Sequence, residues 1–293
     1  MSARIIPRYQ FMEIAKNNSE LSRWLIDSNS SFGQIGFVPT MGALHEGHLS
    51  LIKRSLKENR HTIISIFVNP KQFNNPLDLQ RYPRTLETDI GLLSTLPNDN
   101  MLLYVPSEQD VYGDNPFFNL DLGILDTVLE GKFRPGHFQG VAHVVHNLFQ
   151  LVKPKSAYFG KKDFQQLAVI RHLVQEMNLN VKIVACPTLR SYEGLALSSR
   201  NSLLNEQERQ DALAITRTLN HIQQLAKHAS PKTAKEEGIR LIEKSNLKLE
   251  YLELINGNTF DALDEEWGSY SVCCIAAFSG DVRLIDNMEL QFD

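Results

Sequence analysis

The chain has 293 residues, of which 42% are hydrophobic and 22% are charged, as in a globular protein that buries its own core. This composition excludes a disordered, collagen-like or coiled-coil chain, and at roughly 150 residues per domain the length fits one large domain or two ordinary ones. With 30 Lys and Arg against 34 Asp and Glu, the net charge of −4 argues against nucleic-acid partners, because non-specific binding needs a basic face.

The first two thirds of the chain alternate between short apolar runs and helical patterns. The runs predict strands at 34–39, 62–68, 101–105, 157–159 and 181–185. The helical patterns lie at 47–59, 83–96, 136–152 and 163–177. Because short buried strands that alternate with helices are typical of βαβ units, we expect an α/β, Rossmann-like domain with a parallel sheet over residues 1–187.

The pattern changes after Pro187. A polar, serine-rich loop is followed by two helical patterns, the first opened by the capping-box residues Asn205 and Glu208 and the second by Ser230 and Pro231. Strand-like runs follow at 247–255, 271–277 and 282–285. We therefore expect a smaller C-terminal α+β domain over residues 188–293 that acts as a lid on the first.

The cysteines and the N-terminal segment bear on location. Three cysteines are too few, and odd in number, for a disulfide framework; Cys273 and Cys274 lie in an apolar run and are expected in the core. The first 18 residues show no signal-peptide pattern, and the longest apolar stretch, 272–278, is too short to span a membrane. These features predict a cytoplasmic protein with no membrane partner.

The segment 39–55, PTMGALHEGHLSLIKRS, follows a predicted strand and opens a predicted helix. His45 and His48 share one face of the first turn, and Gly42 and Gly47 let a ligand approach the backbone. A helix N-terminus attracts phosphate, and the imidazoles can donate to its oxygens as charge builds up. The plainer alternative is a polar helix start; zinc is disfavoured because the spacing is not HExxH and no third ligand is evident.

A second polar segment, YFGKKDFQQLAVIRHL at 158–173, runs from a strand end into a helix, where open α/β sheets bind ligands. Lys161 and Lys162 are cationic donors, Asp163 is a helix cap or a ribose or metal partner, and Gln166 lies one turn further on. A capped helix with solvated lysines explains the residues equally well.

A third segment, GLALSSRNSLL at 194–204, lies between the two expected domains. Ser198 and Ser199 supply hydroxyls and Arg200 a fork-shaped cation, a set that suits triphosphate oxygens. An ordinary polar linker is the alternative, but clefts between domains commonly hold ligands.

A fourth segment, FVNPKQFNNPLDLQRYPRT at 67–85, follows another strand. Amides such as Gln72 donate and accept, which suits a small polar substrate, although a plain turn cluster is the alternative. His143 and His146 share a helix face, and we expect them to be partly buried helix residues rather than ligands.

Five blocks in chain order resemble the pantoate–β-alanine ligase (pantothenate synthetase) family: PTMGALHEGHLSL, FVNPKQF, EGKFRPGHFQGV, YFGKKDFQQL and GLALSSRN. That family belongs to the nucleotidyltransferases with HIGH and KMSKS elements. In this chain HEGH would correspond to the first element and ALSSRN to a modified second element. The resemblance implies a step of pantothenate biosynthesis in which pantoate attacks the α-phosphate of ATP. Pantoyl adenylate and pyrophosphate form, and the amine of β-alanine then displaces AMP.

The resemblance also implies residue roles. His48 would be the proton donor, and Gln72 and Gln166 would hold pantoate, with Gln72 also near β-alanine and with Asn69 and Thr40 in the same pocket. The catalytic donors would be His45, His48, Lys162, Ser198, Ser199 and Arg200. The ATP site would comprise Met41, Gly42, Ala43, Leu44, His45, Glu46, Gly47, His48, Gly160, Lys161, Lys162, Asp163, Leu189, Leu197, Ser198, Ser199 and Arg200. The family further implies Mg²⁺ and a homodimer.

Three residues depart from the family pattern: Leu197 stands where Met is common, and Ser191 and Lys161 stand where acidic residues are common. Two functional alternatives stay open. Another HIGH-type nucleotidyltransferase would have no reason for FVNPKQF or for Gln166. A regulatory module that only binds nucleotide would bind ATP without releasing pyrophosphate.

Overall fold

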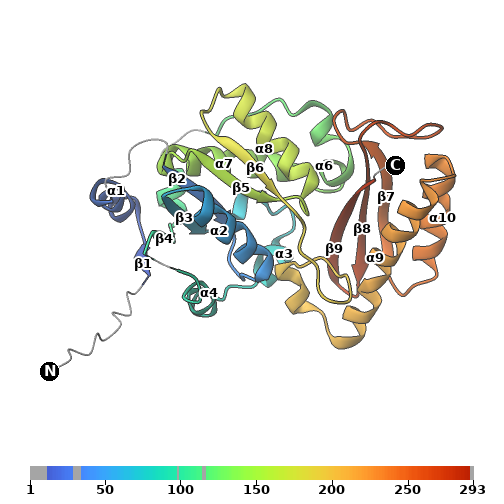
Figure 1. Cartoon of the computed structure of the whole chain (residues 1–293), viewed down its shortest axis with the longest axis horizontal. Coiled ribbons are helices and arrows are strands. Elements are labelled where there is room, and N and C mark those ends of the chain that lie inside the picture. The colour runs from blue at the N-terminus through green and yellow to red at the C-terminus, as the bar shows by residue number, and fades with distance from the viewer. Residues whose placement is uncertain (1–11, 29–33, 98, 114–116, 291–293) are drawn as a thin grey trace.

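The computed structural model describes residues 12–28, 34–97, 99–113 and 117–290. Much of the N-terminal segment considered for a signal peptide therefore lies outside the described residues. The start of the expected first domain and the end of the expected second domain also lie outside them. Two sheets organise the described part of the chain, a larger parallel one and a smaller antiparallel one (Figure 1). No described helix is long and apolar enough to cross a membrane.

The larger sheet has six strands in the order β1-β4-β3-β2-β5-β6, and every pair is parallel. The strands are β1 (Glu13–Ala15), β2 (Ile35–Thr40), β3 (His61–Ile66), β4 (Met101–Tyr104), β5 (Ser156–Gly160) and β6 (Lys182–Cys186). From β2 the chain adds strands first on one side and later on the other. Because the order reverses there, the loops after β2 and β5 border one crevice, the usual ligand site of such sheets.

Helices cover both faces of this sheet. One buried core joins it to α1 (Asn18–Asp27), α7 (His137–Val152) and α8 (Phe164–Glu176), and another joins it to α2 (Glu46–Glu58) and α4 (Leu86–Leu93). The expected Rossmann-like fold is therefore confirmed. Short elements were missed, and they are α3 (Pro76–Arg81), α5 (Glu108–Tyr112), α6 (Leu129–Phe133) and the 3-10 turns η1 (Pro70–Gln72) and η2 (Gly123–Asp126).

The expectation of one helix over 83–96 was too long, and β1 and α1 were not predicted at all. Pro83 lies between α3 and α4, and a proline forces the residue before it, Tyr82, into extended backbone, so the two helices stay separate. β1 has three residues and only pairs with β4 at the sheet edge, too short a run for periodicity to reveal.

The smaller sheet is antiparallel, in the order β7-β8-β9. It comprises β7 (Lys248–Asn256), β8 (Ser271–Ser279) and β9 (Val282–Leu290), and it follows η3 (Ser199–Leu203), α9 (Glu206–Leu225) and α10 (Pro231–Glu243). β9 extends past the expected 282–285 because it pairs along the whole of β8. The expected α+β character is confirmed.

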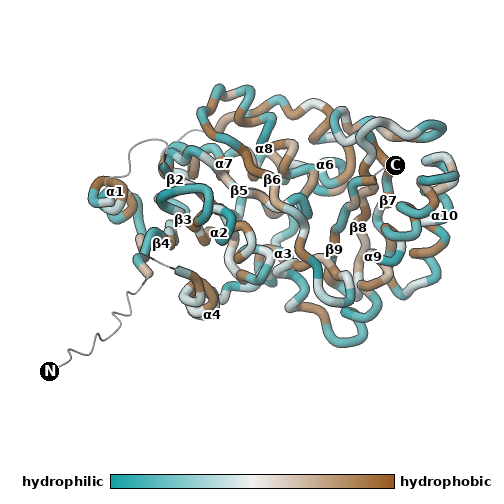
Figure 2. Tube along the Cα trace, viewed as in Figure 1, coloured by the Kyte–Doolittle hydropathy of each residue, from teal (hydrophilic) through white to brown (hydrophobic). Residues whose placement is uncertain are grey.

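β8, whose hydrophobic run is visible in Figure 2, is buried on both faces and joins two cores. Cys273 packs in the core formed with α9 and α10, whereas the next residue, Cys274, packs in the core of the larger sheet. Side chains alternate along a strand, so one strand can contribute to both. The smaller sheet is therefore a wall between its own helices and the parallel sheet, and both cysteines are core residues, as expected.

Candidate active site

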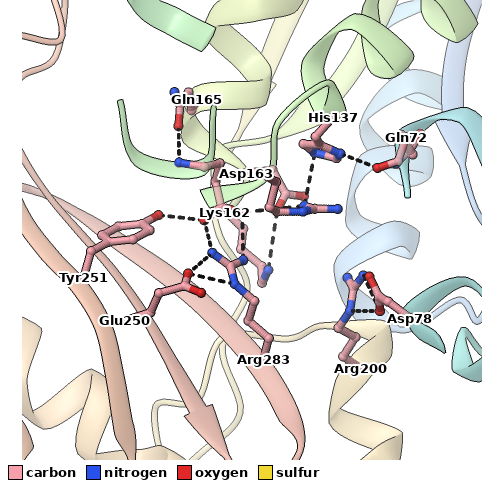
Figure 3. Close-up of polar contacts among 12 residues, drawn as sticks. Gln72, Asp78, His137, Lys162, Asp163, Gln165, Arg200, Glu250, Tyr251 and Arg283 are labelled. Atoms are coloured by element: carbon pink, nitrogen blue, oxygen red, sulfur yellow. Dashed lines mark hydrogen bonds and ion pairs between the residues drawn. The ribbon is translucent and has the colours of Figure 1, made fainter. Parts of the chain in front are cut away.

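A cavity of about 1180 Å³ lies where the two sheets meet. Met41 follows β2, Gln72 follows β3 and Asp163 follows β5, and all three line it. The opposite wall comes from β9, with Arg283 and neighbouring residues. The close-up in Figure 3 shows Tyr251 and Arg283 of the smaller sheet pointing toward the polar groups around Lys162 and Asp163. The cavity thus occupies the crevice that the strand order predicts.

The loop between β2 and α2 is held by a buried carboxylate. The backbone N–H groups of Ala43 and Leu44 donate to Asp89 at 2.9 and 2.8 Å, and the Thr85 hydroxyl donates to it at 3.2 Å. Gly42 has φ of 79° and Ala43 has φ of 47°, a turn that brings two amides onto one side chain. Asp89 was not predicted, because in the sequence it is one of two acidic residues in the first turn of a helical pattern.

The two histidines of this loop cap α2 together. The Gly47 N–H donates to His45 Nδ1 at 3.1 Å, and the His45 N–H donates to His48 Nδ1 at 3.3 Å. The ring centroids are 4.1 Å apart. Because both Nδ1 atoms accept, each neutral ring carries its proton on Nε2.

Both rings are neutral at physiological pH. Burial, aided by the charge of Lys162, lowers the pKa of His45 to about 4. Burial, aided by His45 and Lys162, lowers the pKa of His48 to about 3. The pair can therefore donate hydrogen bonds through Nε2–H without carrying a positive charge, which leaves the cationic role to neighbouring side chains.

The two lysines in the loop after β5 have different partners. Lys162 lines the cavity, with Nζ 3.5 Å from Asp163, whose side chain is the more exposed of the two. Lys161 instead donates to both carboxylate oxygens of Glu289 on β9, at 2.8 Å each. The Lys161 side chain therefore ties the larger sheet to the smaller one, and contact of Lys161 with ATP stays a prediction.

The neighbouring glutamines of α8 also differ. Gln166 lines the cavity, as expected. Gln165 is buried, and its amide bonds to the backbone of the segment before and within α6. It donates to the carbonyls of Leu125 and Val128 at 2.9 Å and accepts from the Glu130 N–H at 2.9 Å. Gln165 therefore holds the start of α6 in place, and Gln166 is the glutamine left to face a ligand.

Asn69 fixes the orientation of the Gln72 side-chain amide by bonding to its oxygen. Asn69 Nδ2 donates to Gln72 Oε1 at 3.0 Å and to the Gly140 carbonyl at 3.2 Å, while its Oδ1 accepts from Tyr112 and Lys71. Asn69 is thus fully engaged and does not line the cavity, contrary to expectation. Because Gln72 Oε1 is taken, its Nε2–H donors are the atoms offered to the cavity.

The loop before α9 contacts the loop after β2. Ser199 donates to the Ala43 carbonyl at 2.9 Å, and Ser198 Oγ accepts from the Arg200 N–H at 3.3 Å. The Arg200 guanidinium donates to both carboxylate oxygens of Asp78 on α3, at 3.1 and 3.0 Å. Asp78 was missed by the sequence analysis, and its only signal was an acidic residue among amides and prolines.

The structure gathers part of the predicted set around the cavity. The lining residues among those predicted are Met41, Gln72, Lys162, Asp163, Gln166, Ser198 and Arg200. The others lie in the same loops or beside them without lining it: Thr40, Gly42, Ala43, Leu44, His45, Glu46, Gly47, His48, Asn69, Gly160, Lys161, Leu189, Leu197 and Ser199. The side chain of Leu189 is exposed, and its carbonyl accepts from the Leu197 N–H.

A chain of polar groups in the wall of the cavity was not predicted. It contains Glu130, Arg134, His137, Tyr251 and Arg283. The sequence signal for the first three was the block EGKFRPGHFQGV, used above only as part of a resemblance.

Of the histidines outside this loop, His137 packs in the cavity wall and His143 in the core of the protein. His143 is buried against the rings of Tyr112, Phe117 and Phe118, so it is a helix core residue, as expected. Among the residues that the structure describes, no group of three or more His, Cys, Asp or Glu side chains is placed to hold a metal ion.

A parallel sheet whose strand order reverses beside a cavity lined with cationic and amide side chains defines an α/β enzyme of the nucleotide-binding class. The sequence model described as Pantoate-beta-alanine ligase matches residues 13–289. The chain therefore belongs to the pantoate-beta-alanine ligase family, and it is a ligase of pantothenate biosynthesis.

Individual relatives agree. The chain is 48% identical over 259 residues to a pantothenate synthetase of Bacteroides fragilis, covering 87% of this chain and 91% of the relative. It is 47% identical over 279 residues to that of Azobacteroides pseudotrichonymphae, covering 94% and 99%. Among solved structures, pantothenate synthetase from Thermus thermophilus matches with a TM-score of 0.88 at 38% identity, covering 95% and 99%. Pantoate-beta-alanine ligase from Francisella tularensis, complexed with β,γ-ATP and β-alanine, matches with a TM-score of 0.80 at 39% identity, covering 95% and 97%.

Proposed function

We propose that the chain joins pantoate to β-alanine in this cavity, through a pantoyl adenylate and with release of pyrophosphate and then AMP. One observation carries the proposal. Donors from separate loops face one cavity: Lys162, Arg200, Gln72 and Gln166 all line it. The Ser199–Ala43 hydrogen bond joins the loop of Arg200 to the loop after β2. The related Francisella enzyme, which is complexed with β,γ-ATP and β-alanine, supports the same ligands here.

The first step needs donors rather than a nucleophile on the protein. The pantoate carboxylate attacks the α-phosphorus, the bond to the bridging oxygen breaks, and pyrophosphate takes the electron pair. Negative charge builds up on the phosphate oxygens, where fixed donors lower the barrier most. Lys162 and Arg200 are two of the cations that line the cavity, and His48 offers a neutral Nε2–H beside the N-terminus of α2.

Pantoate would be held by the two cavity glutamines. Asn69 turns the Gln72 amide so that its N–H groups face the cavity, which suits the hydroxyl and carboxylate oxygens of pantoate. Gln166 lies on α8 one turn beyond Asp163. The amine of β-alanine then attacks the acyl carbon, and AMP leaves with the electrons of the acyl–oxygen bond.

Arg200 would change partner during the reaction. In the structure its guanidinium is paired with Asp78 on α3, and both side chains are partly buried. A triphosphate brings more negative charge than one carboxylate, so it would compete with Asp78 for Arg200. Binding of ATP would thereby release α3 from the loop at 194–204.

Asp163 is the cavity carboxylate that suits Mg²⁺, which usually combines one or two carboxylates with substrate phosphates. Such an ion would supply neutralisation of the leaving pyrophosphate. Asp163 is half exposed and makes an ion pair with Lys162 at 3.5 Å, so it could turn toward a phosphate-bound ion.

Further proposals rest on the family and on charge. We propose two domains, 1–187 and 188–293, with the second acting as a lid, because ion pairs such as Lys161–Glu289 join the two parts. A homodimer is proposed from the family resemblance. A cytoplasmic location and the absence of nucleic-acid partners are proposed from the cysteine usage and the net charge of −4.

AMP formation tests the proposal directly. The purified chain should form AMP from ATP only when pantoate and β-alanine are both present, with pantothenate in equal amount. Turnover with pantoate replaced by another acid would point to a different nucleotidyltransferase. ATP binding without any pyrophosphate release would point to a module that only binds nucleotide.

A further inference from the structure

A buried imidazole links the cavity glutamine to an arginine. His137 Nδ1 lies 2.8 Å from the backbone carbonyl of Gln72, as Figure 3 shows, and its Nε2 lies 3.1 Å from Nη1 of Arg134. A carbonyl only accepts, so His137 carries its proton on Nδ1 and accepts from Arg134 at Nε2. Burial, aided by Arg134, lowers the pKa of His137 to about 3, which keeps this neutral tautomer at physiological pH.

Arg134 lines the cavity with donors to spare. Its side chain is 15% exposed, and its described partners are His137 at 3.1 Å and Glu130 at 3.6 Å, both at Nη1. Within the described part of the chain, neither Nε nor Nη2 takes part in these contacts. A guanidinium always carries its charge, so a nearly buried one with unused donors favours an anion beside it.

Glu130 does not fill that role. Its two carboxylate oxygens accept from Arg283 at 2.8 Å each, and one also accepts from Tyr251 at 2.8 Å. Arg283 is shared in turn with Glu250 on β7. Glu130 therefore fixes Arg283 and the smaller sheet, and it meets Arg134 only at the longer distance of 3.6 Å. The planar fork of Arg134 remains available for bidentate contact with a carboxylate.

We propose that Arg134 binds the carboxylate of β-alanine. We further propose that His137 is a positioning residue, which holds the Arg134 side chain at a fixed distance from Gln72. This rests on the proposed function. Of the reaction's anionic groups, the phosphates face Lys162 and Arg200, and the pantoate carboxylate is consumed as it becomes the acyl group. The β-alanine carboxylate keeps its charge throughout and needs a lasting cation. Arg134 is linked to Gln72 through the imidazole of His137. With its carboxylate on Arg134, β-alanine would point its amine at the acyl group of pantoate beside Gln72.

The test separates the two half-reactions. Arg134→Gln and Arg134→Lys would be compared with the wild type and with Arg240→Gln, an exposed arginine on α10. Each would be assayed for pantoate-dependent pyrophosphate–ATP exchange and for acyl transfer to β-alanine and to β-alaninamide, which lacks the carboxylate. Arg134→Gln should keep the exchange, lose about 30-fold or more in kcat/KM for β-alanine, and lose the preference for β-alanine over its amide. Arg134→Lys should keep part of that preference.

Two results would overturn the inference. The first is an unchanged preference for β-alanine over β-alaninamide in Arg134→Gln. The second is loss of the exchange itself in both Arg134 variants, because the residue would then serve pantoate or ATP, or the fold. Failure of exchange in the wild type would instead contradict the proposed function and is distinguishable from both. A changed preference in Arg240→Gln would show that the effect is not specific to the cavity.

Discussion

The two walls of the cavity are held by different kinds of interaction. On the wall of the parallel sheet, the loop after β2 is fixed by backbone amides: Ala43 and Leu44 donate to Asp89, and the cap of α2 is closed on His45 and His48. On the wall of the smaller sheet and the loop before it, charged side chains make the contacts, as in Arg200–Asp78 and Lys161–Glu289.

The difference separates fixed from exchangeable parts of the site. Backbone amides bound to a buried carboxylate cannot easily change partner, which suits donors that must be in place before charge develops. Side-chain ion pairs that are partly exposed are worth little and exchange readily. We therefore expect the loop after β2 to be preorganised and the opposite wall to rearrange when substrates bind.

The largest expected effect comes from the fixed wall. His48→Ala should reduce pantoate-dependent pyrophosphate–ATP exchange by about 10²–10³-fold, because one donor to the transition state is lost. His221→Ala, on the exposed face of α9, is the matched control. Exchange within twofold of the wild type in His48→Ala would show that the fixed wall does not serve the phosphate.

Asp89→Asn should damage the same wall without touching substrate. An amide cannot accept from Ala43 and Leu44 with both of its terminal atoms, so a backbone N–H is left unsatisfied, at a cost of about 1–3 kcal/mol. Urea unfolding and ATP binding should both weaken, whereas Asp264→Asn, at an exposed position, should change neither. Lower stability with unaltered ATP affinity would separate the loop from the nucleotide site.

The buried histidines predict how stability depends on pH. The pKa of His137 is lowered from 6.5 to about 3, so between these values the unfolded chain binds a proton that the folded chain does not. Its contribution is complete above about pH 6.5 and is lost as the pH falls, by up to about 1.4 kcal/mol per pH unit. His137→Gln should flatten the unfolding free energy between pH 6.5 and 4; an identical slope would refute the assignment.

The smallest effect is expected at the exchangeable wall. Lys161 and Glu289 are each about one-third exposed, at 37% and 31% of the side chain. Lys161→Gln, Glu289→Gln and the double variant should give a coupling energy of no more than about 1 kcal/mol in urea unfolding. A coupling several times larger would mean that this wall is as fixed as the other.

The fold was largely predictable because it depends on patterns that the chain repeats. Buried runs such as His61–Ile66 alternate with amphipathic helices, and the strand ends carried the polar motifs. Short elements such as α3 escaped because five or six residues show no periodicity, and the full length of β9 depends on pairing with β8.

The placement of a site residue was predictable where it depends on the residue's own loop or helix start, as for His45, His48, Gln72 and Gln166. Their roles stay predictions. The sequence did not predict that Lys161 pairs with Glu289 or that Asn69 orients Gln72. These pairings depend on the tertiary fold. Asp89 was missed for the same reason, because it bonds to a loop far away in the sequence. Arg134 has sequence neighbours as partners, but its place in the cavity wall depends on the tertiary fold.

Isotope exchange between pyrophosphate and ATP tests the central claim most directly. If the cavity forms a pantoyl adenylate, labelled pyrophosphate should enter ATP when pantoate is present and β-alanine is absent. Arg200→Ala should depress that exchange because a cation for the triphosphate is lost. Exchange that strictly requires β-alanine would contradict the account, since the two substrates would then react in one step without an adenylate.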